Sequence, residues 1–293
     1  LAAQNCGIAV FAVLDWWSYY KERFERIMPD GSIVSSRPDF VCAIDDTTKE
    51  GLIQVGFSSD KIYITGGANL EWSINKMKRF EFRRDLIRAS MDIQSEQKCA
   101  VFFSEPYIRA IDGMMWSGVG GYYNEKGKPI YGYTPYSILK ALAVTLAELE
   151  NEEKIVLVVK PHPMEHIPSL SIVIDQLKEE LDLKIILYRE GDPAPLYIAG
   201  DIFFGMISIV LIESSLSKKP VFSLQLGMPD TDNDSFIGNK LGFTRPVYDL
   251  ENLKHCICDW VNHQLSKIPF RQKLNIEGSI QKTLDVIIEK GLN

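Results

Sequence analysis

The chain has 293 residues, 46% hydrophobic and 24% charged, a composition typical of an ordinary globular protein. Its net charge of -7 argues against a nucleic-acid partner, which would favour a basic surface. No apolar run approaches the roughly 18 residues of a membrane span. The five cysteines are scattered, as in reduced proteins. We therefore expect a cytoplasmic protein of about two domains.

Short apolar runs alternate with polar segments in the amino-terminal part of the chain. They predict strands over residues 7–14, 40–44 and 61–65, a turn at 28–32 and a helix at about 48–55. This rhythm is that of half of a doubly wound parallel sheet. Residues 1–6 look like the end of a preceding helix, so we expect this domain to be incomplete.

A charged segment, residues 71–91, has a helical pattern and predicts a helix that connects two domains. Further on, the glycine-rich residues 108–133 predict an irregular loop, because the spacing of a phosphate-binding fingerprint is absent. We expect one domain over residues 1–97 and another over residues 98–293.

Apolar strands and amphipathic helices alternate regularly after residue 98. The expected strands are 99–103, 155–159, 184–188, 201–205 and 220–224. The expected helices are 134–149, 170–181, 209–217, 251–265 and 270–290, with a short one near 193. Strands without polar alternation are typical of a parallel sheet covered on both faces. The sequence therefore predicts an α/β protein with two Rossmann-like domains.

One of these strands, residues 155–159, ends in Lys160-Pro161-His162-Pro163. Ligands of open α/β sheets bind outside the carboxyl ends of the strands. A histidine held between two prolines at such an end is well placed to contact a ligand. On its own, this motif predicts only a rigid turn beside a binding site.

A second candidate segment lies where the strand 201–205 turns into a helix. Ser208 can cap that helix, whose free N–H groups would attract an anion. Glu213 follows within an apolar stretch, so its carboxylate needs polar partners, such as the hydroxyls of a ribose. A plain helix cap is the alternative interpretation of Ser208.

These two segments, with Ser214 and Ser215 after Glu213, resemble the C-terminal domain of GT-B glycosyltransferases. The pairs His162-Pro163 and Ser214-Ser215 are similar to the His-Pro and Ser-Ser motifs of bacterial capsule transferases of the polysialyltransferase kind. UDP-N-acetylglucosamine 2-epimerases share the layout. The segment from Asp15-Trp16-Trp17 through residue 66 looks like the second half of a GT-B N-terminal domain.

The resemblance implies a nucleotide sugar bound mainly by the C-terminal domain, with no metal and no other cofactor. His162 would contact the phosphate, with Lys160 beside it, and Glu213 would hold the ribose. The hydroxyl groups of three serines would bind phosphate: Ser208, Ser214 and Ser215. The catalytic base is predicted as Asp15, with Glu105 as second choice, although each also has a structural interpretation.

The expected function is a glycosyltransferase that moves sugar from a nucleotide donor to a glycan or lipid-linked acceptor in surface polysaccharide synthesis. Its acceptor would bring it to the membrane periphery. The first alternative is a sugar-nucleotide 2-epimerase, which needs several carboxylates around the sugar, and the sequence motifs supply few. The second alternative is a GT-B remnant that binds nucleotide without turnover.

Overall fold

The structure is a computed structural model that describes residues 2–105, 109–111, 114–116, 135–150, 154–228, 231, 234–265, 274 and 276–291. Its contacts divide the chain into two compact units. Unit 1 consists of Leu1–Asn75 and Lys273–Asn293, and unit 2 consists of Lys76–Gln272. The predicted domain limits, 1–97 and 98–293, stay a prediction.

Unit 2 is built on a parallel sheet of six strands in the order β10-β9-β6-β11-β12-β13. The strands are β6 (Lys98–Phe103), β9 (Ile155–Lys160), β10 (Lys184–Leu187), β11 (Ile202–Gly205), β12 (Val221–Leu224) and β13 (Arg245–Val247). Numbered as they follow in the chain, they stand in the order 3-2-1-4-5-6 of a doubly wound Rossmann sheet. Five of the six were predicted. The sixth, β13, is short, contains Pro246 and lies at the edge, where proline is tolerated.

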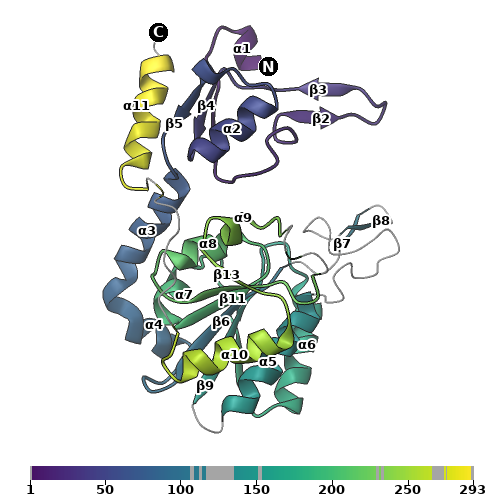
Figure 1. Cartoon of the computed structure of the whole chain (residues 1–293), viewed down its shortest axis with the longest axis vertical. Helices are drawn as coiled ribbons and strands as arrows, with labels where there is room; N and C mark the ends of the chain where they lie inside the picture. The colour runs from purple at the N-terminus through teal and green to yellow at the C-terminus, as the bar shows by residue number, and fades with distance from the viewer. Residues whose placement is uncertain are drawn as a thin grey trace. The chain divides into compact units, whose positions relative to one another are not determined.

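Helices cover both faces of this sheet (Figure 1). One layer holds α5 (Pro135–Glu150), α6 (Ile167–Glu180) and α10 (Leu250–Val261), and the other holds α4 (Arg84–Ser90), α7 (Ala194–Ala199) and α8 (Ile209–Ser215). A four-residue helix, α9 (Ile237–Lys240), was not predicted. Every residue of β9 is buried, as its unbroken apolar run predicted. The predicted fold class is confirmed for this unit.

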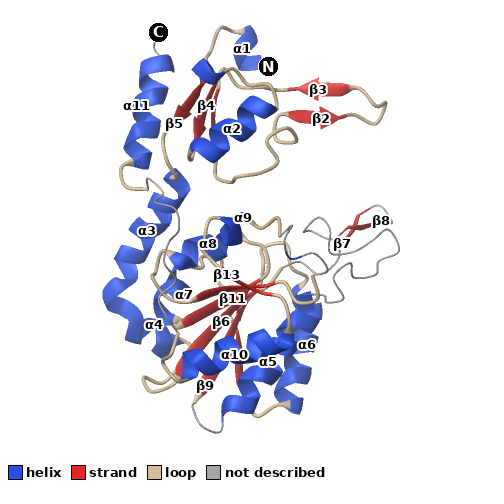
Figure 2. Cartoon of the chain, viewed as in Figure 1, coloured by secondary structure: helices blue, strands red, loops and turns tan. Residues whose placement is uncertain are grey.

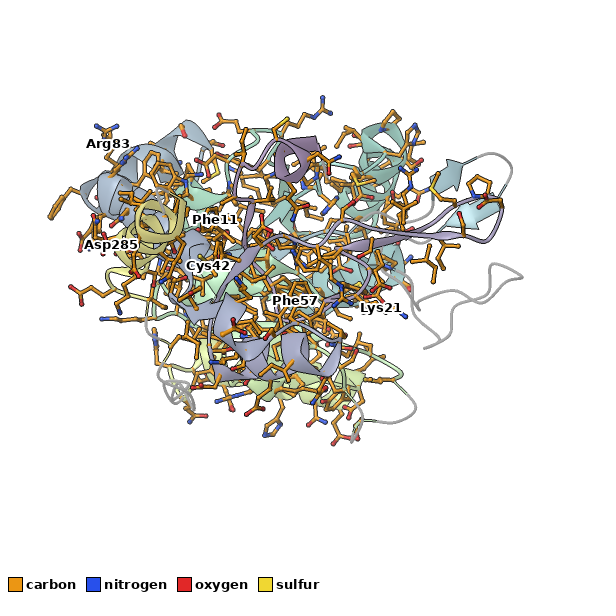
Figure 3. The ribbon with its side chains drawn as sticks, turned by 90° about the horizontal axis from the view of Figure 1, so that it is seen from above. Phe11, Lys21, Cys42, Phe57, Arg83 and Asp285 are labelled. Carbon is orange, nitrogen blue, oxygen red and sulfur yellow. The ribbon has the colours of Figure 1, made fainter. Side chains whose placement is uncertain are left out.

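Unit 1 has a smaller parallel sheet, β1 (Phe11–Val13), β4 (Phe40–Ala43) and β5 (Ile62–Ile64), in the order β1-β4-β5. Helix α2 (Asp46–Gln54) joins the last two strands, as predicted. Strand β1 is shorter than the predicted 7–14. Val41 and Leu52 anchor its core, and Phe57, labelled in Figure 3, packs with them. Unit 1 is therefore also a Rossmann-like α/β unit.

An antiparallel hairpin of β2 (Glu25–Ile27) and β3 (Ile33–Ser35) extends from unit 1 (Figure 2). The turn between its strands was predicted, but the strands were not. All residues of β3 and two of the three in β2 are exposed. Exposed strands of three residues lack the apolar run by which a strand is recognised in a sequence.

The last helix, α11 (Ser279–Gly291), packs in unit 1 although it ends the chain. Glu71 accepts hydrogen bonds from the backbone N–H groups of Gly278 and Ile280, at 2.8 and 2.7 Å, and so caps the start of this helix. At its other end, Gly291 lies close to Phe11 of β1, which is labelled in Figure 3. The carboxyl-terminal segment thus completes the first unit.

Residues 71–91 are helical over nearly their whole length, as predicted, but they do not form one uninterrupted α-helix. The segment forms α3 (Ala68–Phe80), one 3-10 turn (Glu81–Arg83) and then α4. On α4, the buried Arg88 pairs with Asp201, the residue before β11. The predicted loop at 108–133 lies mostly outside the described residues, which include only the antiparallel pair β7 (Arg109–Ile111) and β8 (Met114–Trp116) there. No described helix is long and apolar enough to span a membrane.

Candidate functional site

The candidate site lies where the order of the unit 2 strands reverses, at the carboxyl ends of β6 and β11. These strands are neighbours in the sheet, but the helices that follow them cover opposite faces. The two chain segments therefore diverge, and ligands of doubly wound sheets bind in the crevice that this divergence opens. Glu105 follows β6, and Ile207 and Ser208 follow β11.

Glu105 is a buried carboxyl group at this point, only 2% exposed. The backbone N–H of Ile207 donates a hydrogen bond to its Oε1 at 2.5 Å and so ties the end of β6 to the end of β11. Its Oε2 is buried and has no hydrogen-bond partner among the described residues. Burial, reinforced by the nearby carboxylate of Glu165, raises the pKa of Glu105 to about 8.

Glu165, in the turn after β9, is a second buried carboxylate near the first. The hydroxyl groups of Ser104 and Tyr136 donate hydrogen bonds to its two oxygens, at 2.9 and 3.0 Å. The sequence interpretation missed this residue. Its position three residues after His162 was the available signal, because the backbone N–H of Glu165 closes the turn on the carbonyl of His162.

His162 is half-buried at the end of β9, where the sequence placed it. The backbone N–H of Met164 donates a hydrogen bond to its Nδ1 at 3.1 Å, which puts the ring proton on Nε2. Burial and the positive charge of Lys160 lower the pKa of His162. The imidazole is therefore neutral near pH 7 and offers Nε2–H as a hydrogen-bond donor.

Lys160 is the last residue of β9 and is only 7% exposed. Its ammonium donates a hydrogen bond to the carbonyl of Pro161 at 3.0 Å. Burial lowers its pKa, and the negative charge of Asp192 opposes that shift. Lys160 and His162 thus form a weakly basic pair at one strand end.

Glu213 lies on α8, the helix that follows β11. The hydroxyl of Tyr197 donates a hydrogen bond of 2.6 Å to its Oε2. Burial and the charge of Glu213 raise the pKa of Tyr197 well above its ordinary value, so the phenol remains a donor. Tyr197 was not predicted from sequence, because it lies on α7, one strand away from the motif that contains Glu213.

The three predicted phosphate-binding serines have different surroundings. Ser208 is half-buried at the N-cap of α8, a helix of seven residues, and its side chain caps no backbone N–H. Ser214 and Ser215 are buried within α8, and their hydroxyls donate hydrogen bonds of 2.9 and 2.6 Å to carbonyls of the preceding turn. Of the three, Ser208 is the one whose hydroxyl is not engaged by its own helix in this way.

Asp15 is the predicted residue that falls in the other unit. It follows β1 in unit 1, and its exposed carboxylate pairs with Arg23 at 2.9 Å. Its backbone carbonyl accepts a hydrogen bond from the side chain of Asn69. Both of these partners of Asp15 belong to unit 1.

No protein-family model matches the chain, and a search of curated proteins found no match. Solved structures do match. UDP-GlcNAc 2-epimerase from Neisseria meningitidis, bound to UDP-GlcNAc, is 14% identical with a TM-score of 0.62, over 98% of this chain and 71% of its own. UDP-GlcNAc 2-epimerase from Methanocaldococcus jannaschii is 15% identical with a TM-score of 0.61, over 99% and 72%. HepE from Anabaena, in complex with UDP and glucose, is 13% identical with a TM-score of 0.51, over 98% and 73%.

These likenesses extend over nearly the whole chain and define its fold as GT-B, two Rossmann-like units in one chain. They bear out the coarse part of the resemblance found in the sequence. The predicted function, a glycosyltransferase, is wrong: many of the structures that match are UDP-GlcNAc 2-epimerases, which correspond to the alternative left open by the sequence. The expected glycan or lipid-linked acceptor stays a prediction.

Proposed function

We propose that this protein is an enzyme acting on a nucleotide sugar, of the UDP-N-acetylhexosamine 2-epimerase type. The fold supports a site for the nucleotide in unit 2, at the carboxyl ends of its strands. The observation that carries the proposal is the pair of neighbouring buried carboxyl groups, Glu105 and Glu165, at that edge. His162 follows the adjacent strand β9, in the turn that also holds Glu165. The sequence alone offered few carboxylates there, which was the argument against an epimerase.

Epimerisation at C2 of a sugar replaces the hydrogen on one face of the carbon by a hydrogen on the other. Such chemistry needs groups that give up and accept protons near neutral pH. Glu105 keeps a proton near neutral pH, because burial raises its pKa to about 8, and His162, whose pKa is lowered by burial, is neutral there. Carboxyl groups with raised pKa in strand-end crevices are typical of catalytic sites.

Recognition of the nucleotide is assigned to Ser208 and Glu213, which follow β11, and to His162, which follows β9. Glu213, fixed by the hydroxyl of Tyr197, has the chemistry to accept hydrogen bonds from ribose hydroxyls. The neutral Nε2–H of His162 is suited to hydrogen-bond a phosphate oxygen. Ser208 keeps its predicted role as a further phosphate ligand. Asp15 has no role in this proposal.

The test is incubation of the protein with UDP-GlcNAc in D2O, followed by proton NMR. An epimerase that removes and returns a proton at C2 will replace the hydrogen on C2 by deuterium from the solvent. It will also produce the anomeric signal of the C2 epimer. Thermal melting with UDP, CDP, GDP and CMP, run in parallel, identifies the nucleotide that the protein binds. We expect the midpoint to rise with UDP.

Two outcomes contradict the proposal. If no nucleotide raises the melting midpoint and no exchange occurs, the protein does not act on nucleotide sugars. If UDP raises the midpoint but UDP-GlcNAc shows no exchange and no new anomeric signal, the protein binds the nucleotide without turnover, which was the second alternative.

A further inference from the structure

The two oxygens of the buried Glu105 carboxyl group have different surroundings. One oxygen accepts a backbone hydrogen bond from Ile207, and the other is buried without a partner among the described residues. A buried polar atom without a partner costs about 1–3 kcal/mol, so a folded protein retains one where something else satisfies it. The place of this atom, at the switch point of the sheet, indicates that a bound ligand does so.

The electrostatic neighbours of Glu105 decide its protonation. Glu165, from the turn after β9, contributes a negative charge. From β11 the facing group is the uncharged amide of Ile207, and from β6 it is the neighbouring Ser104, whose hydroxyl is committed to Glu165. Burial is the main cause that raises the pKa of Glu105 to about 8, and no described cation offsets the charge of Glu165, so the carboxyl of Glu105 retains its proton near neutral pH.

We propose that Glu105 acts as a neutral carboxylic acid whose Oε2–H donates a hydrogen bond to a phosphate oxygen of the bound nucleotide. Ile207 occupies Oε1, so the proton is carried by the unpartnered oxygen. This inference rests on the proposed function for the identity of the nucleotide.

The kind of ligand follows from this protonation state. A sugar or ribose hydroxyl is itself a donor, and an ionised carboxylate would bind it well. A phosphate oxygen only accepts, and an ionised carboxylate would repel it. A carboxyl group that is kept neutral therefore matches a phosphate group, and its hydrogen bond to a charged acceptor belongs to the stronger class.

The inference predicts a pH-dependent affinity. If only the protonated form of Glu105 binds UDP, the competent fraction falls to about one tenth at about pH 9. We therefore expect the Kd of UDP for the wild-type protein, measured by calorimetry, to rise about tenfold between about pH 7 and about pH 9.

Glu105→Gln is the diagnostic variant, because an amide donates and accepts as the neutral acid does but does not titrate. We expect it to bind UDP with a Kd within a few-fold of the wild-type value at about pH 7, and without the tenfold rise up to about pH 9. Glu105→Ala should bind UDP weakly both at about pH 7 and at about pH 9, because it has no donor group. Glu179→Gln, an exposed carboxylate on α6, is the matched control and should keep the wild-type profile. Any ionisation of UDP itself over this pH range is the same for all of these proteins. A difference between their pH profiles therefore comes from Glu105.

Uridine and inorganic pyrophosphate separate the possible sources of the acceptor oxygen. We expect pH dependence with UDP and with pyrophosphate, and none with uridine. The inference is overturned if wild-type affinity is flat with pH, if Glu105→Gln retains the dependence, or if neither UDP nor pyrophosphate binds. If UDP binding behaves as described but UDP-GlcNAc is not epimerised, the proposed function fails and this inference stands.

Discussion

Acidic side chains at the two ends of the unit 2 sheet differ in how many hydrogen-bond partners they have. At the amino end of β11, Asp201 accepts hydrogen bonds from the side chains of Arg84 and Arg88. The backbone N–H of Cys99, on β6, donates a third at 2.8 Å. At the carboxyl ends of the same two strands, Glu105 receives one hydrogen bond and leaves one oxygen unpartnered among the described residues.

Two lysines, Lys219 at the amino side of the sheet and Lys160 at the carboxyl side, differ in the same way. The half-buried ammonium of Lys219 donates hydrogen bonds of 3.0, 2.7 and 2.6 Å to three carbonyls at the end of α7, those of Tyr197, Ile198 and Gly200. Lys160, at the carboxyl end of β9, has one carbonyl acceptor among the described residues. Buried charges with several partners join elements of the fold, whereas incompletely partnered ones are typical of binding sites.

The largest effect is expected at the amino end. Asp201→Ala leaves Arg88, only 2% exposed, with its charge unpaired. Loss of one partner of a buried pair costs about 3–5 kcal/mol. We expect the melting midpoint, followed by circular dichroism, to fall by on the order of 10 °C. Asp182→Ala, at an exposed position, is the control, and equal melting of both variants would contradict the assignment.

At the carboxyl end, stability should depend on pH through Glu105. Between about pH 5 and about pH 8 the folded chain keeps a proton on Glu105 that the unfolded chain has released, so the free energy of unfolding falls with rising pH. Glu105→Gln removes this fall. The midpoint of the variant should exceed that of the wild type by an amount that grows over this range, to several degrees, and is constant above it.

The measurement is a series of melts of both proteins in matched buffers. A difference in midpoint that does not change with pH would show that Glu105 is ionised in the folded chain.

A smaller effect is expected for His162→Ala. Loss of the Nε2–H donor should weaken UDP binding by about tenfold, the effect of one hydrogen bond to a charged group. His162→Gln, which keeps a donor, should recover part of the affinity. His255→Ala, at an exposed position of α10, is the control. Unchanged UDP binding in His162→Ala would remove His162 from the nucleotide site.

The smallest effect is expected for Tyr197→Phe, which removes the hydroxyl that fixes Glu213 and keeps the ring in place. UDP affinity should fall by about two- to fivefold, because the carboxylate loses its orientation but not its charge. Tyr188→Phe breaks a similar tyrosine–glutamate hydrogen bond, to Glu190, at the edge strand β10. Equal loss in both variants would indicate a general effect on unit 2 and not a role for Glu213.

Much of the fold was predictable because it depends on local patterns. Buried parallel strands such as β6, β9 and β11 are apolar runs between helices, and that alternation defines a doubly wound sheet. The ends of these strands also pointed to His162, Glu105 and Glu213 as candidates. The hairpin of β2 and β3 was missed because exposed strands carry no such pattern.

What the sequence alone determined is the α/β class, the parallel sheet of unit 2 and the strand ends at which its polar residues gather. The tertiary structure decided which of those residues meet. Glu105 and Glu165 are neighbours because β6 and β9 pair side by side, and Tyr197 reaches Glu213 because α7 and α8 flank β11. It also placed α11 in unit 1, through the cap that Glu71 supplies. Such contacts join residues far apart in the chain, and no local pattern encodes them.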